Sequence, residues 1–461
     1  MLESEQGEVY TVFKTRKILF IFIATLCGSL GPLAANIFLP SIEVFQHVFH
    51  TSKQAINGTI SMFMFVIAFA PLFLSLWSDN YGRRPLLLSS LSVYLIANIL
   101  ILTLPPNIIA FYIFRAFQGF GASNLAVGVG VIADISEPKN RAKAISYYMI
   151  GPQMGPVFGP MLGMVGARFS WRYNFIILSI FGGISLILVF FFLPETLRTI
   201  VGNGSDSSQK IIVPFSSRKA NDLQAILNKP KRPGIMLYLR LCINRPVLLC
   251  AVSGGLAFSC FYAVTVSFSE ALTNVYGFDV LHVCLAYIAP GVALVLGSII
   301  FGILSDLLRK QDTLKYGIES RFKLQIACLL PFLGAVISFG WVVQSSGHFA
   351  YVILLTFLVA FLVSGILITN TTYLSELSRN QPASYVAFGN LIRNMGAAVF
   401  VACVNPMTNK VGYGWGFTIY ALTCSVSFIF SILVLMFGSH WREALNRDTE
   451  SVSEKDFQSA S

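Results

Sequence analysis

Charged residues are scarce in this chain. Only 11% of its 461 residues are Asp, Glu, Lys or Arg, whereas 55% are hydrophobic and 40 are Phe. Soluble domains carry about 25% charged residues, and a soluble core of this length has no room for so much apolar surface. The composition therefore excludes a soluble globular protein and predicts one that lies in a lipid bilayer.

Residues that hold metals, disulfides or nucleotide phosphates are also few. Five His and eight Cys are spread along the chain without a CxxC motif or a Cys/His cluster, and we expect the cysteines to be small packing residues. No G-x-x-x-x-G-K-S/T segment occurs, which argues against ATP-driven work. We therefore expect no metal and no bound cofactor.

The positive charge of the chain does not indicate a nucleic-acid partner. The net charge is +11 and the pI is about 9.3, but the basic residues are scattered through the links between apolar runs. A nucleic-acid-binding protein gathers them on one face or domain.

Apolar runs bounded by polar residues, Pro or Gly indicate twelve membrane-spanning helices. They fall into two sets of six, separated by a longer polar stretch, so we expect an all-α membrane protein. The first set covers 18–39, 56–77, 86–104, 108–133, 142–166 and 172–194, and the second covers 247–272, 281–304, 324–343, 349–374, 384–405 and 415–438.

Basic residues predict the orientation of these spans. With both termini in the cytoplasm, 26 of the 32 Lys and Arg lie in cytoplasmic segments and only four on the opposite side, as the positive-inside rule requires. The expected parts are a cytoplasmic N-terminal segment (1–17), a first six-helix half (18–194), a cytoplasmic linker (195–246), a second six-helix half (247–438) and a cytoplasmic tail (439–461). We expect the acidic tail from Asp448 onward to be disordered.

A charged island, SDNYGRRP at 78–85, lies between the second and third expected spans. Asp79, at a helix end, can pair with basic side chains and with the N-terminus of a neighbouring helix. Gly82 permits a tight turn, and we expect Arg83 and Arg84 to anchor to lipid phosphates. A similar cluster with Asp306 and Arg309 recurs at 302–310, which indicates one membrane unit present twice.

Two six-helix halves, each with this charged link after its second helix, resemble the major facilitator superfamily of secondary transporters over nearly the whole chain. The segment PETLR at 194–198, followed by GNGS at 202–205, resembles the fungal drug:proton antiporters with 12 spans, which include quinidine-resistance, weak-acid and dityrosine exporters. The resemblance implies two pseudo-symmetric halves around a central cavity and no enzymatic activity. It also implies a latch that holds the halves together in the outward-open state, formed by Asp79, Gly82, Arg83, Arg84, Asp306 and Arg309. In this chain Ser75 replaces the Gly that leads the family motif.

The fourth span carries an arginine deep in the membrane. Arg115 lies about 10 Å from the outer boundary of its helix, and the segment from Arg115 to Gly119 resembles an R-x-x-x-G motif of proton-driven transporters. Gln118 shares its helix face. We expect these two residues to serve proton coupling or the cavity, with a structural hydrogen-bond anchor as the alternative.

The fifth span is rich in glycine and proline. Glycines every four residues make a smooth face for close helix packing, and prolines let the helix bend. The pattern resembles a motif that marks exporters, with Pro160 in place of its final Gly, although ordinary helix packing remains the alternative. The expected motif residues are Gly151, Pro152, Gly155, Pro156, Gly159 and Gly163.

Polar residues deep in other spans are candidates for the substrate cavity. Such groups line a cavity or bond to neighbouring helices, and both alternatives stay open here. The candidates are Asn36, Tyr262, Asn370, Asn390 and Arg393.

Proton coupling needs a group that changes its charge, which Asn36 in the first span cannot do. We expect that Glu270, Asp134 or Asp79 titrates, or that coupling is absent.

The chain is thus predicted to be a proton-coupled exporter of amphiphilic small molecules, monomeric and in the plasma membrane, with vacuolar or prospore membranes as alternatives. The other hypotheses are an importer or exporter of polyamines or other nutrients, and a sensor that transports nothing. Because Arg115 and Arg393 give the spans an excess of positive charge, we expect weak acids or zwitterions to compete well as substrates.

Overall fold

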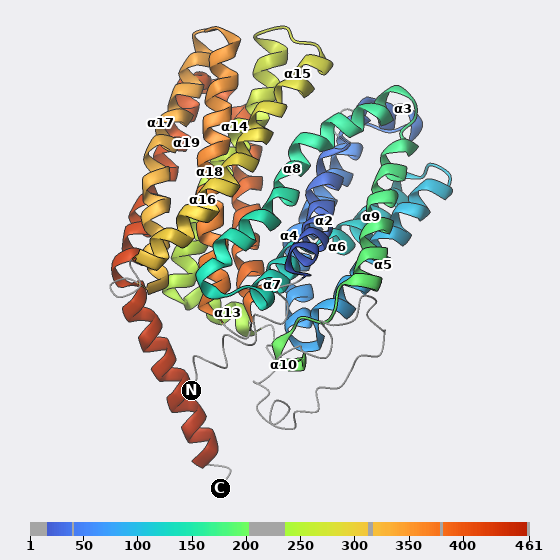
Figure 1. Cartoon of the computed structure of the whole chain (residues 1–461). Coiled ribbons are helices and arrows are strands. Elements are labelled where there is room, and N and C mark those ends of the chain that lie inside the picture. The colour runs from blue at the N-terminus through green and yellow to red at the C-terminus, as the bar shows by residue number, and fades with distance from the viewer. Residues whose placement is uncertain (1–15, 39–40, 202–235, 312–316, 379–380, 459–461) are drawn as a thin grey trace.

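The computed structural model describes residues 16–38, 41–201, 236–311, 317–378 and 381–458. Its long helices form two groups that stand side by side (Figure 1). The first group contains α2 (Lys17–Asn36), α4 (Lys53–Tyr81), α5 (Arg83–Thr103), α6 (Ile108–Ala122), α7 (Leu125–Ile135), α8 (Arg141–Arg168) and α9 (Arg172–Phe192). The second contains α14 (Arg245–Asn274), α16 (Ile288–Gln311), α17 (Phe322–Gln344), α18 (Phe349–Leu377) and α19 (Pro382–Gln458).

Short helices join the long ones. They are α3 (Ile42–Val48), α10 (Arg198–Val201), α13 (Met236–Ile243) and α15 (Val280–Ala286), together with the 3-10 turns η3 (Pro138–Asn140) and η4 (Gly317–Arg321). Helices α10 and α13 lie at one end of the molecule, which we call the linker end, whereas α3 and α15 lie at the far end (Figure 1). The part of the chain that the structure describes contains no strand.

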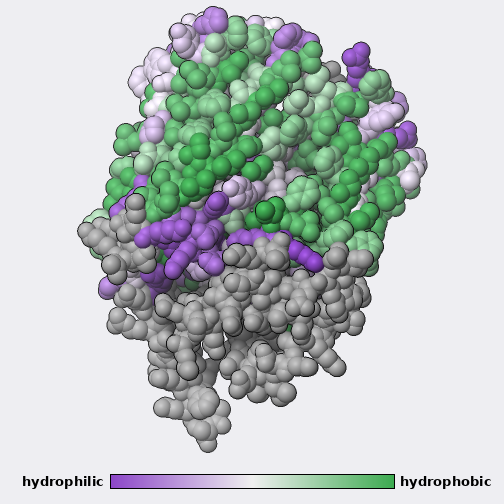
Figure 2. Space-filling model, viewed as in Figure 1, coloured by the Kyte–Doolittle hydropathy of each residue, from purple (hydrophilic) through white to green (hydrophobic). Residues whose placement is uncertain are grey.

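Eleven of the described helical segments are long and apolar enough to cross a membrane. The remaining predicted span, 142–166, corresponds to α8, a helix of 28 residues whose many Gly and three Pro residues lower its hydropathy. The predicted all-α membrane fold is therefore confirmed. Figure 2 shows apolar side chains over the sides of both groups and hydrophilic ones toward the two ends, the distribution that a bilayer requires.

Two of the expectations need correction. The fourth span is not one helix, because it breaks between α6 and α7 at Ser123 and Asn124, where the Asn124 amide bonds to the Gly121 carbonyl. The last two predicted spans are present as two separate apolar segments of α19, which is interrupted at Gly412, whose φ of 80° only glycine adopts readily. The tail is helical through Gln458 instead of disordered, because 443–458 contains no Gly or Pro that would end the helix.

The buried side chains form two core clusters, and the groups meet mainly along two helix pairs. One cluster is centred on α2 and α5 to α9 and extends into the second group at Val247, Tyr373 and Val386, and the other is centred on α14 to α19. Across the boundary, α4 packs against α19 and α8 packs against α16. The ribbons of the two groups converge toward the linker end (Figure 1).

Candidate functional site

The linker end holds buried ion pairs that join the two groups. Arg83, in the first turn of α5, donates from Nε to Asp134 Oδ2 at 2.9 Å and from Nη1 to Asp79 Oδ1. Asp79 Oδ2 accepts from the backbone N–H of Ser384 at 3.0 Å and from its hydroxyl. Ser384 lies in the first turn of α19, so an acid of the first group stabilises the N-terminus of a helix in the second. We call these four residues the first latch.

A second latch repeats this arrangement with the groups exchanged. Arg321, at the end of η4, donates to Asp306 Oδ1 at 2.9 Å and to Glu376 Oε1 at 3.1 Å. Asp306 accepts from the backbone N–H groups of Ala142 at 3.2 Å and Lys143 at 2.8 Å, in the first turn of α8. The two acids thus hold the N-termini of α19 and α8 from opposite groups.

The second latch differs in one residue from the sequence prediction. Arg321, and not Arg309, takes the place that Arg83 has in the first latch, although Arg309 also binds Glu376 at 2.9 Å. Sequence reasoning missed Arg321 because the second charged link is longer than the first, so Arg321 lies farther from Asp306 than Arg83 does from Asp79. The signal that could have found it is its position directly before the next apolar run. Asp134, expected among the proton-coupling or cavity residues, lies in the first latch.

The prediction that Arg83 and Arg84 anchor to lipid phosphates is wrong. Arg83 is fully buried and Arg84 is 7% exposed. Arg84 Nη2 donates to the Phe190 carbonyl at 2.6 Å. Both guanidinium groups therefore have hydrogen-bond partners inside the protein, where burial without any partner would be very unfavourable.

Glu195 is a further functional candidate, which the sequence analysis assigned to a motif without a role. Its carboxylate accepts from the backbone N–H groups of Arg83 at 2.9 Å and Arg84 at 3.1 Å, so it caps α5. Gly82, with φ of 115°, leaves room for it, because a Cβ there would lie 2.4 Å from Glu195 Oε2. Burial raises the pKa of Glu195, since desolvation outweighs these donors.

Helix α13 docks beside the first latch through Tyr238. The Tyr238 hydroxyl donates to the Leu72 carbonyl at 2.6 Å and lies 2.8 Å from Ser75 Oγ. Ser75, which stands where the family motif has Gly, is fully buried against this tyrosine. The end of the linker is thus attached to α4 next to Asp79.

Arg115 is sealed within the first group. Its guanidinium lies between the rings of Phe38 and Phe63, each 4.1 Å from the ring centroid, and the residue has no exposed area. Its Nη1 donates to Gln118 Oε1 at 2.6 Å, which confirms that the two share a helix face. Gln118 continues the chain of hydrogen bonds to Asn98 at 2.6 Å.

The glycine-rich face of α8 packs directly on α2. A Cβ added at Gly151, Gly155 or Gly159 would lie 2.4 to 2.6 Å from an atom of Thr25, Pro32 or Asn36 of α2, respectively. The predicted smooth packing face is therefore confirmed, and Gly163 adds a carbonyl that accepts from Ser41 Oγ at 3.1 Å. The opposite face of α8 meets the second group, where Val157 packs against Gly291 of α16.

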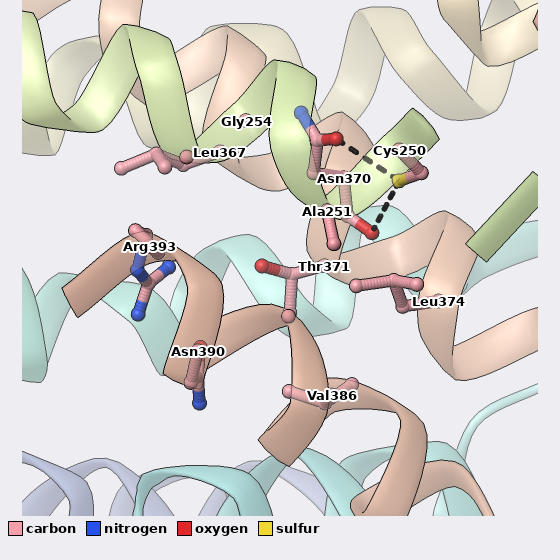
Figure 3. Close-up of a pocket in the computed structure, with 12 residues that line it drawn as sticks. Cys250, Ala251, Gly254, Leu367, Asn370, Thr371, Leu374, Val386, Asn390 and Arg393 are labelled. Atoms are coloured by element: carbon pink, nitrogen blue, oxygen red, sulfur yellow. Dashed lines mark hydrogen bonds between the residues drawn. The ribbon is translucent and has the colours of Figure 1, made fainter. Parts of the chain in front are cut away.

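A small pocket, partly open to solvent, lies between α14, α18 and α19 (Figure 3). Asn370, Asn390 and Arg393 line it. The Asn370 amide is already bonded, because it donates to Gln325 Oε1 at 3.0 Å and accepts from Cys250. Arg393 lies 4.7 Å from the centroid of the Phe258 ring.

The other polar candidates lie elsewhere. The ring centroid of Tyr262 lies 4.6 Å from that of Phe258. Asn36 is in the first group, where its Nδ2 donates to the Pro32 carbonyl at 2.7 Å. Glu270 lies near the far end of α14, away from both latches. The structure therefore brings the second-half candidates together but not Asn36 or Glu270.

The chain matches the family model of the Major Facilitator Superfamily over residues 21–401. It is 36% identical to Dityrosine transporter 1 of Saccharomyces cerevisiae, covering 93% of this chain and 81% of that protein. It is 34% identical to the multidrug transporter DTR1 of Candida glabrata, covering 93% and 85%. The crystal structure of the human organic anion transporter MFSD10 has the same fold, with a TM-score of 0.66 at 16% identity over 90% of this chain and 99% of that one. The chain belongs to the major facilitator superfamily and is a membrane transporter.

Proposed function

We propose that the chain is a proton-coupled antiporter that exports amphiphilic small molecules from the cytoplasm by alternating access. The observation that carries this proposal is the pair of latches. Each one ties an acid of one group to the first turn of a helix in the other, so the two groups can separate at the linker end only if both latches open. A rigid-body rocking transporter needs such a releasable contact at one end.

We infer that this arrangement is the outward-facing state. We place the linker end in the cytoplasm, because the distribution of basic residues favours that orientation. With both latches closed, access from the cytoplasm is blocked and the protein faces outward. Substrate uptake from the cytoplasm then requires the latches to break, and their reformation drives the outward step.

The packing of α8 supports the alternating-access part of this proposal. This helix lies between α2 of its own group and α16 of the other, through Gly155 on one face and Val157 on the next. A bend or shift of α8 therefore changes the contact between the groups. Such tight, Cβ-free contacts are sensitive to small movements of the helix.

Asp79 is the acid whose protonation has the most direct effect. Its two oxygens serve different partners, Arg83 within the group and Ser384 across the boundary. A proton on Asp79 would weaken both interactions at once. Proton binding from one side of the membrane would thereby favour opening of the linker end.

The named relatives suggest substrates with aromatic or amphiphilic character. One is called a dityrosine transporter and another a multidrug transporter. We extend this class to the present chain and place it in the plasma membrane. No single compound follows from the fold.

Transport into inside-out vesicles tests this proposal. With an acidic interior, labelled cationic, neutral and carboxylate compounds should accumulate, and a protonophore should abolish the accumulation. Accumulation that does not depend on the gradient would remove proton coupling. Uptake only into right-side-out vesicles would show import and would favour a nutrient or polyamine transporter.

A further inference from the structure

Arg393 differs from the arginines of the two latches. Arg83 and Arg321 each bind two carboxylates. Within the described part of the chain, Arg393 has neither an ion pair nor a hydrogen bond, and its Nε is buried without a partner. A guanidinium without an anionic partner inside a membrane bundle is costly, which makes Arg393 a candidate for a role that an anionic ligand completes.

Arg115 does not offer the same opportunity. It too lacks a carboxylate, but two phenylalanine rings and Gln118 surround it and leave none of it exposed. Arg393 is only partly buried and lines a pocket. Of these two arginines, only Arg393 therefore presents its positive charge to a pocket that a ligand could enter.

Two neighbours of Arg393 also have free hydrogen-bonding capacity. Thr371 of α18 is 4% exposed and Asn390 of α19 is 5% exposed, and both line the same pocket. Neither side chain has a hydrogen-bond partner among the residues that the structure describes. Asn390 and Arg393 are three residues apart and share a helix face, and the Thr371 hydroxyl projects from the facing helix (Figure 3). The buried Arg393 Nε has no partner, and the two polar side chains beside it could supply further hydrogen bonds to a ligand in the pocket.

The chemistry of these groups favours a carboxylate. A guanidinium offers a planar pair of N–H donors that fits both carboxylate oxygens, and a hydroxyl and an amide can bind the remaining lone pairs. Phe258 covers one side of Arg393, and the ring of Tyr262 extends this aromatic surface. An aromatic ring attached to the carboxylate would pack on this surface.

We propose that Arg393, Thr371 and Asn390 form a subsite that binds the carboxylate of aromatic carboxylic acids. This subsite would define the class of substrate that the transporter exports. The inference therefore rests on the proposed export function. Arg393 makes the main contact, Thr371 and Asn390 complete the hydrogen bonds, and Phe258 holds the ring.

Equilibrium binding to the purified full chain in nanodiscs tests this subsite. The probes are labelled 3-phenylpropionate and its uncharged amide, which differ only in the carboxylate. The wild type should bind the acid at least about tenfold more tightly than the amide, as expected for a charge-assisted pair of hydrogen bonds. Arg393→Gln should remove this preference, whereas Arg168→Gln, at an exposed arginine at the far end of α8, should keep it.

Thr371→Val supplies a second test if the arginine variant does not fold. It preserves side-chain shape and should weaken acid binding several-fold with little effect on the amide. Equal weakening of acid and amide by either variant, or a wild type that does not discriminate between them, would overturn the subsite.

Binding also separates this inference from the proposed function. Discrimination by the wild type in nanodiscs together with gradient-independent transport in vesicles would keep the subsite and reject proton-coupled export. Gradient-driven export of acids that Arg393→Gln leaves unchanged would keep the function and reject the subsite.

Discussion

The carboxylate of Asp79 accepts a hydrogen bond of 3.0 Å from the backbone N–H of Ser384, which lies 305 residues further along the chain. This bond connects the end of α4 with the start of α19. Because the same carboxylate pairs with Arg83, the charge of one residue supports both the fold of its own group and the contact with the other. Both roles are open to test.

Asp79→Asn should reduce transport more than it reduces the amount of protein at the cell surface. Asn keeps an acceptor for Ser384 but loses the ion pair with buried Arg83, and breaking such a pair costs about 3–5 kcal/mol. Efflux per surface-labelled transporter measures the effect, with exposed Glu137→Gln as the control. Equal loss of efflux and surface protein would show that Asp79 serves folding instead.

Gly155→Leu should abolish most export. The new side chain would start 2.4 Å from Pro32 Cβ, where the backbone of α2 cannot move aside, and overpacking of this kind costs about 1–3 kcal/mol or more. Gly183→Leu is the matched control, because nothing lies within 4 Å of a Cβ there. Normal efflux by the Gly155 variant would mean that the contact between α2 and α8 is dispensable.

Glu195→Gln should destabilise the protein by about 1–3 kcal/mol, because an amide cannot accept from the N–H groups of both Arg83 and Arg84. Thermal unfolding in detergent measures this loss.

The pH dependence of the same variant has a defined sign. Burial raises the pKa of Glu195 above its ordinary 4.5, so the folded protein binds this proton more tightly than the unfolded chain does. The wild type should therefore lose stability relative to Glu195→Gln as the pH rises from 4.5 through the raised pKa. A stability difference that instead grows with pH would show that the backbone donors outweigh desolvation.

Tyr238→Phe should loosen α13 without disturbing the spans. It removes a hydroxyl bonded to the Leu72 carbonyl and Ser75 Oγ, worth about 0.5–1.5 kcal/mol per hydrogen bond. Amide hydrogen exchange in α13 should become roughly 5- to 30-fold faster. Tyr276→Phe, which deletes a hydroxyl bonded to Gly347 at the far end, should leave that rate unchanged, and equal rates in both variants would mean that Tyr238 does not hold α13.

The residues of the candidate site were predicted to different extents. Asp79 and Asp306 were found from the charged links, because an acid is conspicuous between apolar runs. Arg393 was found because a charge deep in a span is rare. Glu195 received no role, since its importance comes from backbone N–H groups more than 100 residues away, and backbone donors leave no trace in a sequence pattern.

The sequence by itself determined that this protein lies in a membrane, where its helices run and that its two halves share a charged link. Those properties depend on the transfer of each segment from water to lipid, which is local and additive. Only the tertiary structure decided that Arg321 completes the second latch, that Arg115 is sealed while Arg393 lines a pocket, and that α13 docks on Ser75. Each of these depends on which helices pack together, and residues far apart in the chain become partners only when packing places their donors and acceptors within about 3 Å.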